Sequence, residues 1–158
     1  MDILPATIDD LPAVCALAEE INQLHHERAP HVFAPGGGVM RDYEFWKSLI
    51  AGENEQMLIA KDGAQVTGFI TLKMNPAPTI PFLLPRLICS VRTVVVGKVH
   101  QRRGIGRQLM AAAENWARQH GAAEVRLEVF AFNHSAIALY ELAGYGYQSH
   151  IMTKPISI

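Results

Sequence analysis

Apolar residues recur at helix or strand spacing along most of this 158-residue chain. Spacing of three and four residues, typical of a helix that packs by one stripe, predicts helices over 11–24, 43–50, 105–120 and 134–143. Runs rich in β-branched and aromatic residues predict strands over 3–8, 57–60, 66–73, 87–96, 125–130 and 145–153. The predicted order of elements is therefore β-α-α-β-β-β-α-β-α-β.

Glycine and proline mark the breaks between these elements. Asp62-Gly63 is a strong hairpin signal between the second and third predicted strands. The segment 31–39 holds Gly36-Gly37-Gly38, and the segment 75–85 is rich in proline. Neither composition suits an interior strand or a helix, so the segment 31–39 is expected to be a loop, and the segment 75–85 an exposed loop or an extended edge.

A single layer of strands covered by helices satisfies this order of elements best. No internal repeat, linker or low-complexity segment divides the chain, and a hydrophobic content of 49% is enough for one core. We expect one domain over residues 1–158, of mixed α/β class, with a mixed and largely antiparallel sheet.

Composition narrows the classes of function. The 14 Lys and Arg stand against 15 Asp and Glu, so no global positive field attracts nucleic acid or an anionic membrane. No stretch approaches the ~20 apolar residues of a membrane span, and Met1–Pro5 lacks the basic start of a signal peptide. Cys15 and Cys89 stand far apart in apolar runs, as buried free thiols do in a reducing cytosol. We expect a cytoplasmic protein that binds neither nucleic acid nor membrane.

The segment Gln101-Arg102-Arg103-Gly104-Ile105-Gly106 lies between an apolar strand and a helix. Such a unit presents backbone N–H groups and the positive end of a helix dipole to an anion. Glycine lets phosphate oxygens approach the backbone, and Arg107 and Lys98 add to the local positive charge. This pattern indicates a pyrophosphate-binding turn.

Other interpretations compete with a pyrophosphate site. The two glycines could simply shape a tight corner, with the arginines forming a solvated helix start, since Gly-x-Gly alone is a weak signal. A dinucleotide-binding turn would need a third glycine, where Leu109 stands, and more chain to complete a parallel sheet. A Walker-type loop would need Gly-Lys-Ser or Gly-Lys-Thr, which the sequence lacks.

Two blocks of residues resemble the GCN5-related N-acetyltransferase (GNAT) superfamily. Its signature, Gln/Arg-x-x-Gly-x-Gly/Ala after a strand, is similar to residues 101–106 after Val94-Val95-Val96. Its second block places Asn after the next strand, then Ala and Tyr on a helix, then Gly-Tyr or Gly-Phe. The matching residues here are Asn133, Ala136, Tyr140, Glu141, Gly144 and Tyr145. The resemblance implies the three-layered GNAT-like acyl-CoA N-acyltransferase fold, with the sheet splayed where its fourth and fifth strands part.

The resemblance also implies a role for each matched residue. The backbone of Val94, Val95 and Val96 would hydrogen-bond the pantetheine arm of acetyl-CoA like an added strand. The pyrophosphate would be wrapped by Gln101, Arg102, Arg103, Gly104, Ile105, Gly106 and Arg107. Asn133 would contact the pantetheine or the acyl end, and the Tyr140 hydroxyl would protonate the leaving thiolate. Without the resemblance, Tyr140 would be interpreted as an ordinary core tyrosine on one stripe with Ala136 and Ile137.

The sequence names neither the general base nor the acceptor. Several relatives place a glutamate on the strand before the phosphate turn, but residues 87–93 contain no carboxylate. The candidates for the base are Glu27, His25, His26, His31 and Glu128. The loops at 30–39 and 76–85 could shape the acceptor pocket with Phe33, Phe82 and Leu83, and with Arg86 or Arg92 for a substrate carboxylate. No ligand set accompanies the histidines, so no metal is predicted.

The sequence therefore predicts an N-acetyltransferase that moves an acetyl group from acetyl-CoA directly to a primary amine of a small molecule or peptide. The alternative is a non-catalytic acyl-CoA-binding module of the same fold, which the absence of a strand glutamate favours. The oligomeric state stays open, with a homodimer as one option.

Overall fold

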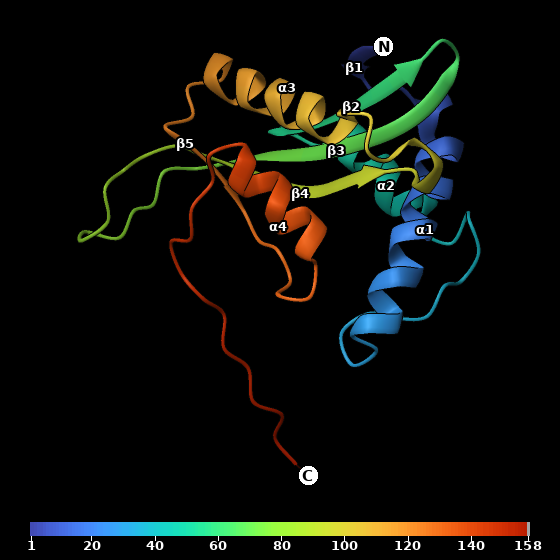
Figure 1. The fold of residues 1–158 in the computed structure, drawn as a ribbon. Helices are drawn as coiled ribbons and strands as arrows, with labels where there is room; N and C mark the ends of the chain where they lie inside the picture. The colour runs from blue at the N-terminus through green and yellow to red at the C-terminus, as the bar shows by residue number, and fades with distance from the viewer. Residues whose placement is uncertain (158) are drawn as a thin grey trace. The chain divides into compact units, whose positions relative to one another are not determined.

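Five strands form one sheet in the order β1-β2-β3-β4-β5 (Figure 1). The strands are β1 (Asp2–Pro5), β2 (Glu55–Asp62), β3 (Gln65–Asn75), β4 (Ile88–Val96) and β5 (Glu124–Leu127). The first four pair antiparallel, and β5 runs parallel to β4. The predicted mixed, largely antiparallel sheet is confirmed, and Gly63 makes the predicted β2–β3 turn with a φ of 60°.

The structure is a computed structural model that describes residues 1–157. It divides into two units, Met1–Glu128 and Val129–Ile158. Within the described residues, no helix has both the length and the apolar character needed to cross a membrane.

Cys15 and Cys89 are free and buried, as expected, and burial raises the pKa of Cys89 to about 11.

The helices agree closely with the sequence pattern. They are α1 (Leu11–Arg28), α2 (Tyr43–Ala51), α3 (Ile105–Gln119) and α4 (His134–Leu142), with short 3₁₀ turns η1 (Ile8–Asp10) and η2 (Lys98–His100). The proline-rich segment between β3 and β4 forms no helix or strand, as predicted.

Helices cover both faces of the sheet in the first unit, giving the expected three layers (Figure 1). On one face, α1 and α2 pack against side chains of β2, β3 and β4, forming one core. Its buried members are Leu11, Val14, Cys15, Leu17, Ala18, Trp46, Met57, Ile59, Phe69 and Val95. On the other face, α3 buries a stripe that consists of Ile105, Leu109, Met110, Ala113 and Ala117.

Gly68 on β3 lets α3 approach the sheet closely. A Cβ atom there would lie 2.7 Å from Val95 O, 3.3 Å from a methyl of Leu109 and 3.4 Å from a methyl of Ile105. The contact with Val95 involves backbone, which cannot move aside as a flexible side chain can. A residue without a side chain at this position therefore fixes the start of α3 over β3 and β4.

The start of α1 is fixed to the sheet by a buried carboxylate. Asp10 accepts hydrogen bonds from the backbone N–H and the hydroxyl of Thr7, both at 2.9 Å, and pairs with Lys61 Nζ of β2 at 2.7 Å. Burial disfavours the charged form of Asp10, but the bonds from Lys61 and Thr7 outweigh it and lower its pKa.

The predicted last strand, Tyr145–Thr153, is wrong for this structure. Residues 145–157 form no helix or strand, and the exposed fractions of Tyr147 and Met152 are 63% and 92%. A local pattern that favours a strand is not sufficient for one, because a strand also needs a neighbouring strand to complete its backbone hydrogen bonds. The predicted strand over 145–153 rested only on the β-strand propensity of its residues. The strand predicted over 125–130 is also shorter, ending at Leu127.

Candidate functional site

The β4 strand loses its β5 partner halfway along its length. Pairing with β5 covers Ile88 to Val91, whereas pairing with β3 continues to Val96. The register between β3 and β4 shifts at the same place, because Thr71 pairs with Thr93 while Leu72 pairs with Val91. Arg92 is thus the extra residue of a β-bulge, a feature that bends a strand and increases its twist. The predicted parting of the fourth and fifth strands is present.

The open edge of β4 presents the backbone groups of alternate residues. Gly97 N–H donates to Thr67 O at 3.0 Å, so Gly97 faces β3. In an antiparallel pair, residues alternate between facing the partner and facing away. Val95 therefore faces β3 as Gly97 does, whereas Val94 and Val96 turn their N–H and C=O groups toward the side that β5 has left. Of the three valines in the predicted pantetheine contact, these two fit it.

The turn that follows β4 reaches back to this open edge. The Gln101 side-chain amide donates to Val96 O at a distance of 3.4 Å. Arg102 then adopts a positive φ of 66°, and Gly104 a φ of 77°. Such backbone conformations reverse the chain sharply and are easiest for glycine. The turn therefore joins the open edge of β4 directly to the start of α3.

The N-terminus of α3 has backbone donors without a capping side chain. Gly104 is its N-cap residue, no side chain caps it, and its first turn contains no acidic residue. A helix leaves its first N–H groups without an intrahelical partner, here those at Ile105, Gly106 and Arg107. A Cβ atom at Gly104 would meet nothing within 4 Å, so the space above the turn is open. These features suit an anion.

Basic side chains surround the same helix start. Arg102, Arg103 and Arg107 are all exposed, and none of them forms an ion pair within residues 1–157. A depression of about 410 Å³ is lined by Gly104, Arg107, Gln108 and Ala111. Backbone donors, exposed arginines and open space thus meet at the place where the sequence motif predicts an anion site.

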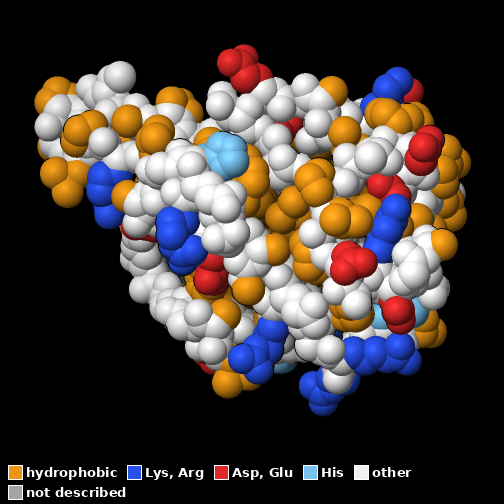
Figure 2. Space-filling model, turned by 90° about the horizontal axis from the view of Figure 1, so that it is seen from above, with side chains coloured by type: hydrophobic (Ala, Val, Ile, Leu, Met, Phe, Trp, Pro, Cys, Tyr) orange, Lys and Arg blue, Asp and Glu red, His pale blue; other side chains and the backbone are white. Residues whose placement is uncertain are grey.

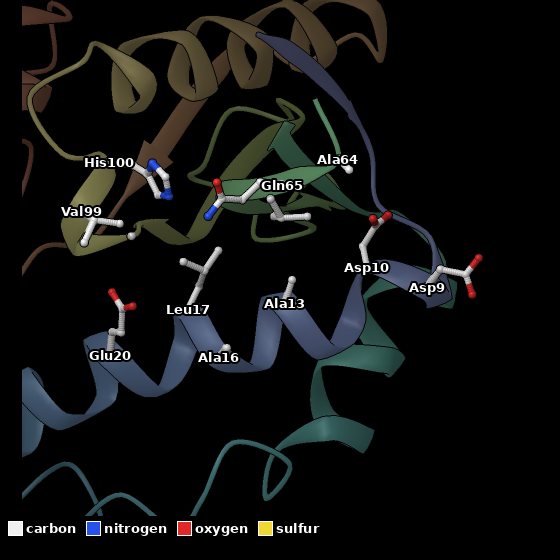
Figure 3. Close-up of a pocket in the computed structure, with 12 residues that line it drawn as sticks. Asp9, Asp10, Ala13, Ala16, Leu17, Glu20, Ala64, Gln65, Val99 and His100 are labelled. Carbon is white, nitrogen blue, oxygen red and sulfur yellow. The ribbon is translucent and has the colours of Figure 1, made fainter. Parts of the chain in front are cut away.

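Sequence reasoning missed a second cavity, of about 390 Å³, beside η2. In Figure 3, Leu17 and Glu20 extend from α1 toward it, while Gln65 and His100 extend from the opposite side. Glu20 Oε2 accepts a hydrogen bond from the backbone N–H of Lys98 at 2.9 Å. No spacing rule connects residues so far apart in the chain, so no sequence signal could have found this contact.

In the second unit, Asn133 caps α4. Its side-chain oxygen accepts a hydrogen bond from Ala136 N–H at 3.3 Å, a contact typical of a helix N-cap. Ser135 Oγ donates to the same oxygen at 3.4 Å. Because that oxygen is engaged in capping, the amide N–H₂ of Asn133 is the group left for a ligand.

Tyr140 lies on α4 with its ring 6.2 Å from the ring of Tyr145, edge to face. Burial raises the pKa of Tyr140 above its ordinary value of 10.0. Within the described residues of the second unit, 129–157, its hydroxyl has no hydrogen-bond partner. The group is therefore protonated near neutral pH and is available as a proton donor.

The candidate bases differ in their surroundings. The His26 ring Nδ1–H donates to Phe33 O at 2.8 Å, and His25 makes a similar contact with Ile21 O at 2.8 Å. These contacts fix the end of α1 and the loop after it. Glu27 accepts a hydrogen bond from Gln23 at 3.1 Å. The described residues contain no group of three or more His, Cys, Asp or Glu placed to hold a metal.

Glu128 has a different position among the candidate bases. It follows Leu127, the last residue of β5 that pairs with β4, and its side chain is exposed. It therefore stands at the point where the two strands part. His31, the remaining candidate, lies exposed in the loop after α1.

The loop between β3 and β4 exposes a set of apolar side chains. Figure 2 shows apolar side chains gathered on the protruding end at the left, where Figure 1 places this loop. Its most exposed members are Phe82, at 86%, and Leu84, at 73%. Arg86 pairs with Glu124 at 3.2 Å, which leaves Arg92, exposed at the β4 bulge, as the better of the two predicted partners for a substrate carboxylate.

Comparison with known protein families finds the acetyltransferase (GNAT) family over residues 18–145. The chain belongs to this family. The match spans the open β4 edge, the turn before α3 and the helix that carries Tyr140. The predicted resemblance is confirmed.

Relatives of known name agree with this family. The chain is 25% identical over 145 residues to an uncharacterised N-acetyltransferase, YhfO, of Bacillus subtilis, covering 92% of this chain and 89% of the relative. The crystal structure of a tetramutant of the BH1408 protein from Bacillus halodurans has a TM-score of 0.93 at 21% identity, covering 99% of this chain and 100% of that one.

A more distant solved structure carries a ligand. The aminoglycoside N-acetyltransferase AAC(6')-Iy in complex with CoA has a TM-score of 0.77 at 14% identity, covering 99% of this chain and 95% of that one. These likenesses at low identity establish the GNAT fold for this chain.

Proposed function

We propose that this protein is an acetyl-CoA-dependent N-acetyltransferase that acts on a primary amine of a small molecule or a peptide. The observation that carries the proposal is the continuity between the open edge of β4 and the uncapped start of α3. An extended amide-containing chain that ends in a pyrophosphate needs a strand edge followed by an anion site. The pantetheine and pyrophosphate of acetyl-CoA are such a chain.

The edge of β4, the start of α3 and the residues near them each offer acetyl-CoA a different kind of contact. Val94 and Val96 supply backbone N–H and C=O groups for the pantetheine amides, as one strand does for another. The first N–H groups of α3, at Ile105, Gly106 and Arg107, supply donors for the pyrophosphate. The exposed arginines next to them add charge-assisted hydrogen bonds. The Asn133 amide N–H₂ is a further donor for the pantetheine or the acyl end.

The proposed reaction needs one proton donor and one proton acceptor. Acetyl-CoA supplies the acetyl group as a thioester, which the amine attacks directly. We assign the donor to Tyr140, because burial raises the pKa of its hydroxyl and no side chain of residues 129–157 competes for that proton. We assign the acceptor to Glu128, because it stands where β4 and β5 part. A positioned acid or base typically contributes ~10²–10⁴-fold in rate.

Two features support an acceptor substrate, either a small molecule or a peptide, that carries an anionic group and an apolar part. The Arg92 side chain is exposed at the bulge, beside the open edge of β4. The apolar loop that holds Phe82 and Leu84 offers contact area for an apolar part of the substrate. The aminoglycoside acetyltransferases among the structural relatives add aminoglycosides to the amines worth testing.

The second candidate function is an acyl-CoA-binding module without turnover. It is favoured by the absence of a carboxylate from β4, since Ile88–Val96 reads ICSVRTVVV. Both functions require acetyl-CoA binding, so only release of CoA distinguishes them.

The test is a screen for CoA thiol release with amino acids, peptides, polyamines and aminoglycosides. We expect at least one class to accelerate release above the rate of thioester hydrolysis, and we expect Tyr140→Phe to lower kcat by ~10²–10⁴-fold without changing acetyl-CoA affinity. If no amine accelerates release while acetyl-CoA binds, the module without turnover is the better account. If acetyl-CoA does not bind, both functions fail.

A further inference from the structure

The cavity beside η2 has the size and position of a binding site for a small molecule. Its volume of about 390 Å³ lies within the ~300–1,000 Å³ that is typical of ligand pockets. Three parts of the first unit enclose it: the first half of α1, the turn that leads into β3, and the segment from the end of β4 to η2 (Figure 3). None of the residues proposed to bind acetyl-CoA lines this cavity.

Part of the cavity wall is apolar. It includes Ala13 and Leu17 of α1 and Val66 of β3. Gly97 borders the same space, and a Cβ atom there would lie 2.9 Å from a methyl carbon of Leu17 and 3.2 Å from ring carbon Cδ2 of His100. A side chain at Gly97 would therefore push against two other lining residues. With glycine in this position, the space remains open and suits a short alkyl chain.

Three polar side chains from separate elements border the cavity and have hydrogen-bonding capacity to spare. Glu20 Oε2 accepts from the backbone N–H of Lys98 at 2.9 Å, which holds the carboxylate in place and leaves Oε1 for a ligand. Gln65 of β3 and His100 of η2 extend toward the cavity from the opposite side (Figure 3). Within the described residues of the first unit, neither of these two side chains forms a hydrogen bond. A few convergent polar groups beside an apolar wall are typical of ligand sites.

The charges around the cavity favour a cationic ligand. Asp10 lines it but is paired with Lys61 Nζ at 2.7 Å. Asp9 and Glu20 also line it, and neither forms an ion pair within the described residues of the first unit. The lining residues, all of which the structure describes, include no Lys or Arg. A bound cation would therefore meet unpaired carboxylate charge and no opposing charge.

We propose that this cavity binds a small alkylguanidinium cation. The planar guanidinium spreads five N–H donors around its edge, so it can reach acceptors that come from more than one element, here Glu20 and Gln65. A primary ammonium concentrates its donors on one atom, and an inorganic cation would leave the apolar wall in contact with water. The inference does not depend on the proposed function. A guanidinium stays protonated at neutral pH and is not an acetyl acceptor.

The test measures binding to the full-length protein by NMR in the absence of acetyl-CoA. The probe is ethylguanidinium chloride, and ethylurea is its uncharged counterpart of the same shape. We expect saturable shifts of the amide signals of Ala64, Gly97 and His100 with a Kd of ~0.1–10 mM, and at least ~10-fold weaker binding of ethylurea. No saturation below ~50 mM, equal binding of the two probes, or shifts confined to other residues would each overturn the proposal.

Two substitutions on α1 test the role of charge. Glu20→Gln removes a charge from the cavity but keeps an oxygen that can accept from Lys98 N–H, and we expect the affinity for ethylguanidinium to fall ~10-fold or more. Glu19→Gln is the matched control, because Glu19 does not line the cavity and instead accepts from Gly38 N–H at 3.4 Å. We expect it to change the affinity less than ~threefold at ~0.15 M salt. Equal losses in the two variants would show a general effect of charge and overturn the site.

A further pair of substitutions tests the space without changing any charge. Ala13→Leu places a larger side chain in the cavity, so we expect the affinity for ethylguanidinium to fall at least ~fivefold. Ala51→Leu makes the same change at the exposed end of α2, away from the cavity lining, and should keep the affinity of wild type. The same spectra report whether each variant is folded, and Glu20→Gln decides the test if Ala13→Leu is not. Unchanged affinity in folded Ala13→Leu would place the ligand outside the cavity and overturn the proposal.

Discussion

Glu20 on α1 accepts a hydrogen bond from the backbone N–H of Lys98, 78 positions later in the chain, at 2.9 Å. Lys98 begins η2, the turn that leads into Gln101–Gly106. The contact therefore connects the helix layer on one face of the sheet to the proposed pyrophosphate site. Neither residue needs to touch acetyl-CoA for the contact to influence its binding.

We expect Glu20→Ala to raise the Kd for acetyl-CoA about threefold to tenfold, because it removes one exposed charge-assisted hydrogen bond that positions the turn. Glu20→Gln is the matched control, since its amide oxygen can still accept from Lys98 N–H. Isothermal titration of both variants measures the difference. Equal affinities for Glu20→Ala and wild type would show that the turn keeps its shape without this contact.

Gly68 is expected to tolerate no side chain. Gly68→Ala would place a Cβ atom 2.7 Å from Val95 O, so either β4 or the start of α3 must shift. We expect a loss of about 1–3 kcal/mol in the free energy of unfolding, measured by urea denaturation. Gly146→Ala is the control, because nothing lies within 4 Å of its new Cβ atom and its φ is not positive. If the two substitutions cost the same, the close approach at Gly68 has no energetic importance.

Asp10 is expected to make the free energy of unfolding depend on pH in the acidic range. Its folded-state pKa is lowered from 3.8, so its contribution is present above about that pH and is lost as the pH falls through the folded value. We expect the difference in unfolding free energy between wild type and Asp10→Asn to be largest near neutral pH and to shrink below pH ~4. Asp9→Asn, which removes a carboxylate from an exposed neighbour, is the control. A difference that stays constant with pH would exclude the Lys61 pair as its source.

Glu128→Gln should reveal the base. We expect kcat near neutral pH to fall by ~10²–10⁴-fold, and the deficit to narrow as the pH rises toward the amine's own pKa near ~10.4, where solvent removes the proton. Glu124→Gln, at the other end of β5, is the control and should keep kcat. If the pH profile of kcat is unchanged in Glu128→Gln, the general base is another residue or water.

The order of elements as far as α4, and the tight turn between β4 and α3, could be predicted from the sequence because both rest on local signals. Apolar spacing sets each helix, and Gly104 and Gly106 stand at fixed positions after a strand. The cap made by Asn133 is equally local. Each of these patterns can be detected within a window of about 20 residues.

The remaining features depend on which segments meet in space. The bulge at Arg92 and the outward-facing groups of Val94 and Val96 follow from the pairing of β4 with β3 and β5, which no single strand encodes. The same holds for the contact between Glu20 and Lys98. The strand predicted over 145–153 is wrong because only its local pattern supported it, and residues 145–157 form no strand.

The most direct test of the central claim is the affinity for acetyl-CoA of three proteins, measured by isothermal titration calorimetry. Gly106→Glu places a carboxylate among the N-terminal donors of α3, while Gln119→Glu places the same charge at the exposed far end of that helix. We expect wild type and Gln119→Glu to bind alike and Gly106→Glu to bind more than ~100-fold more weakly with its fold intact. Equal affinity in all three proteins would contradict the assignment of the pyrophosphate to this turn.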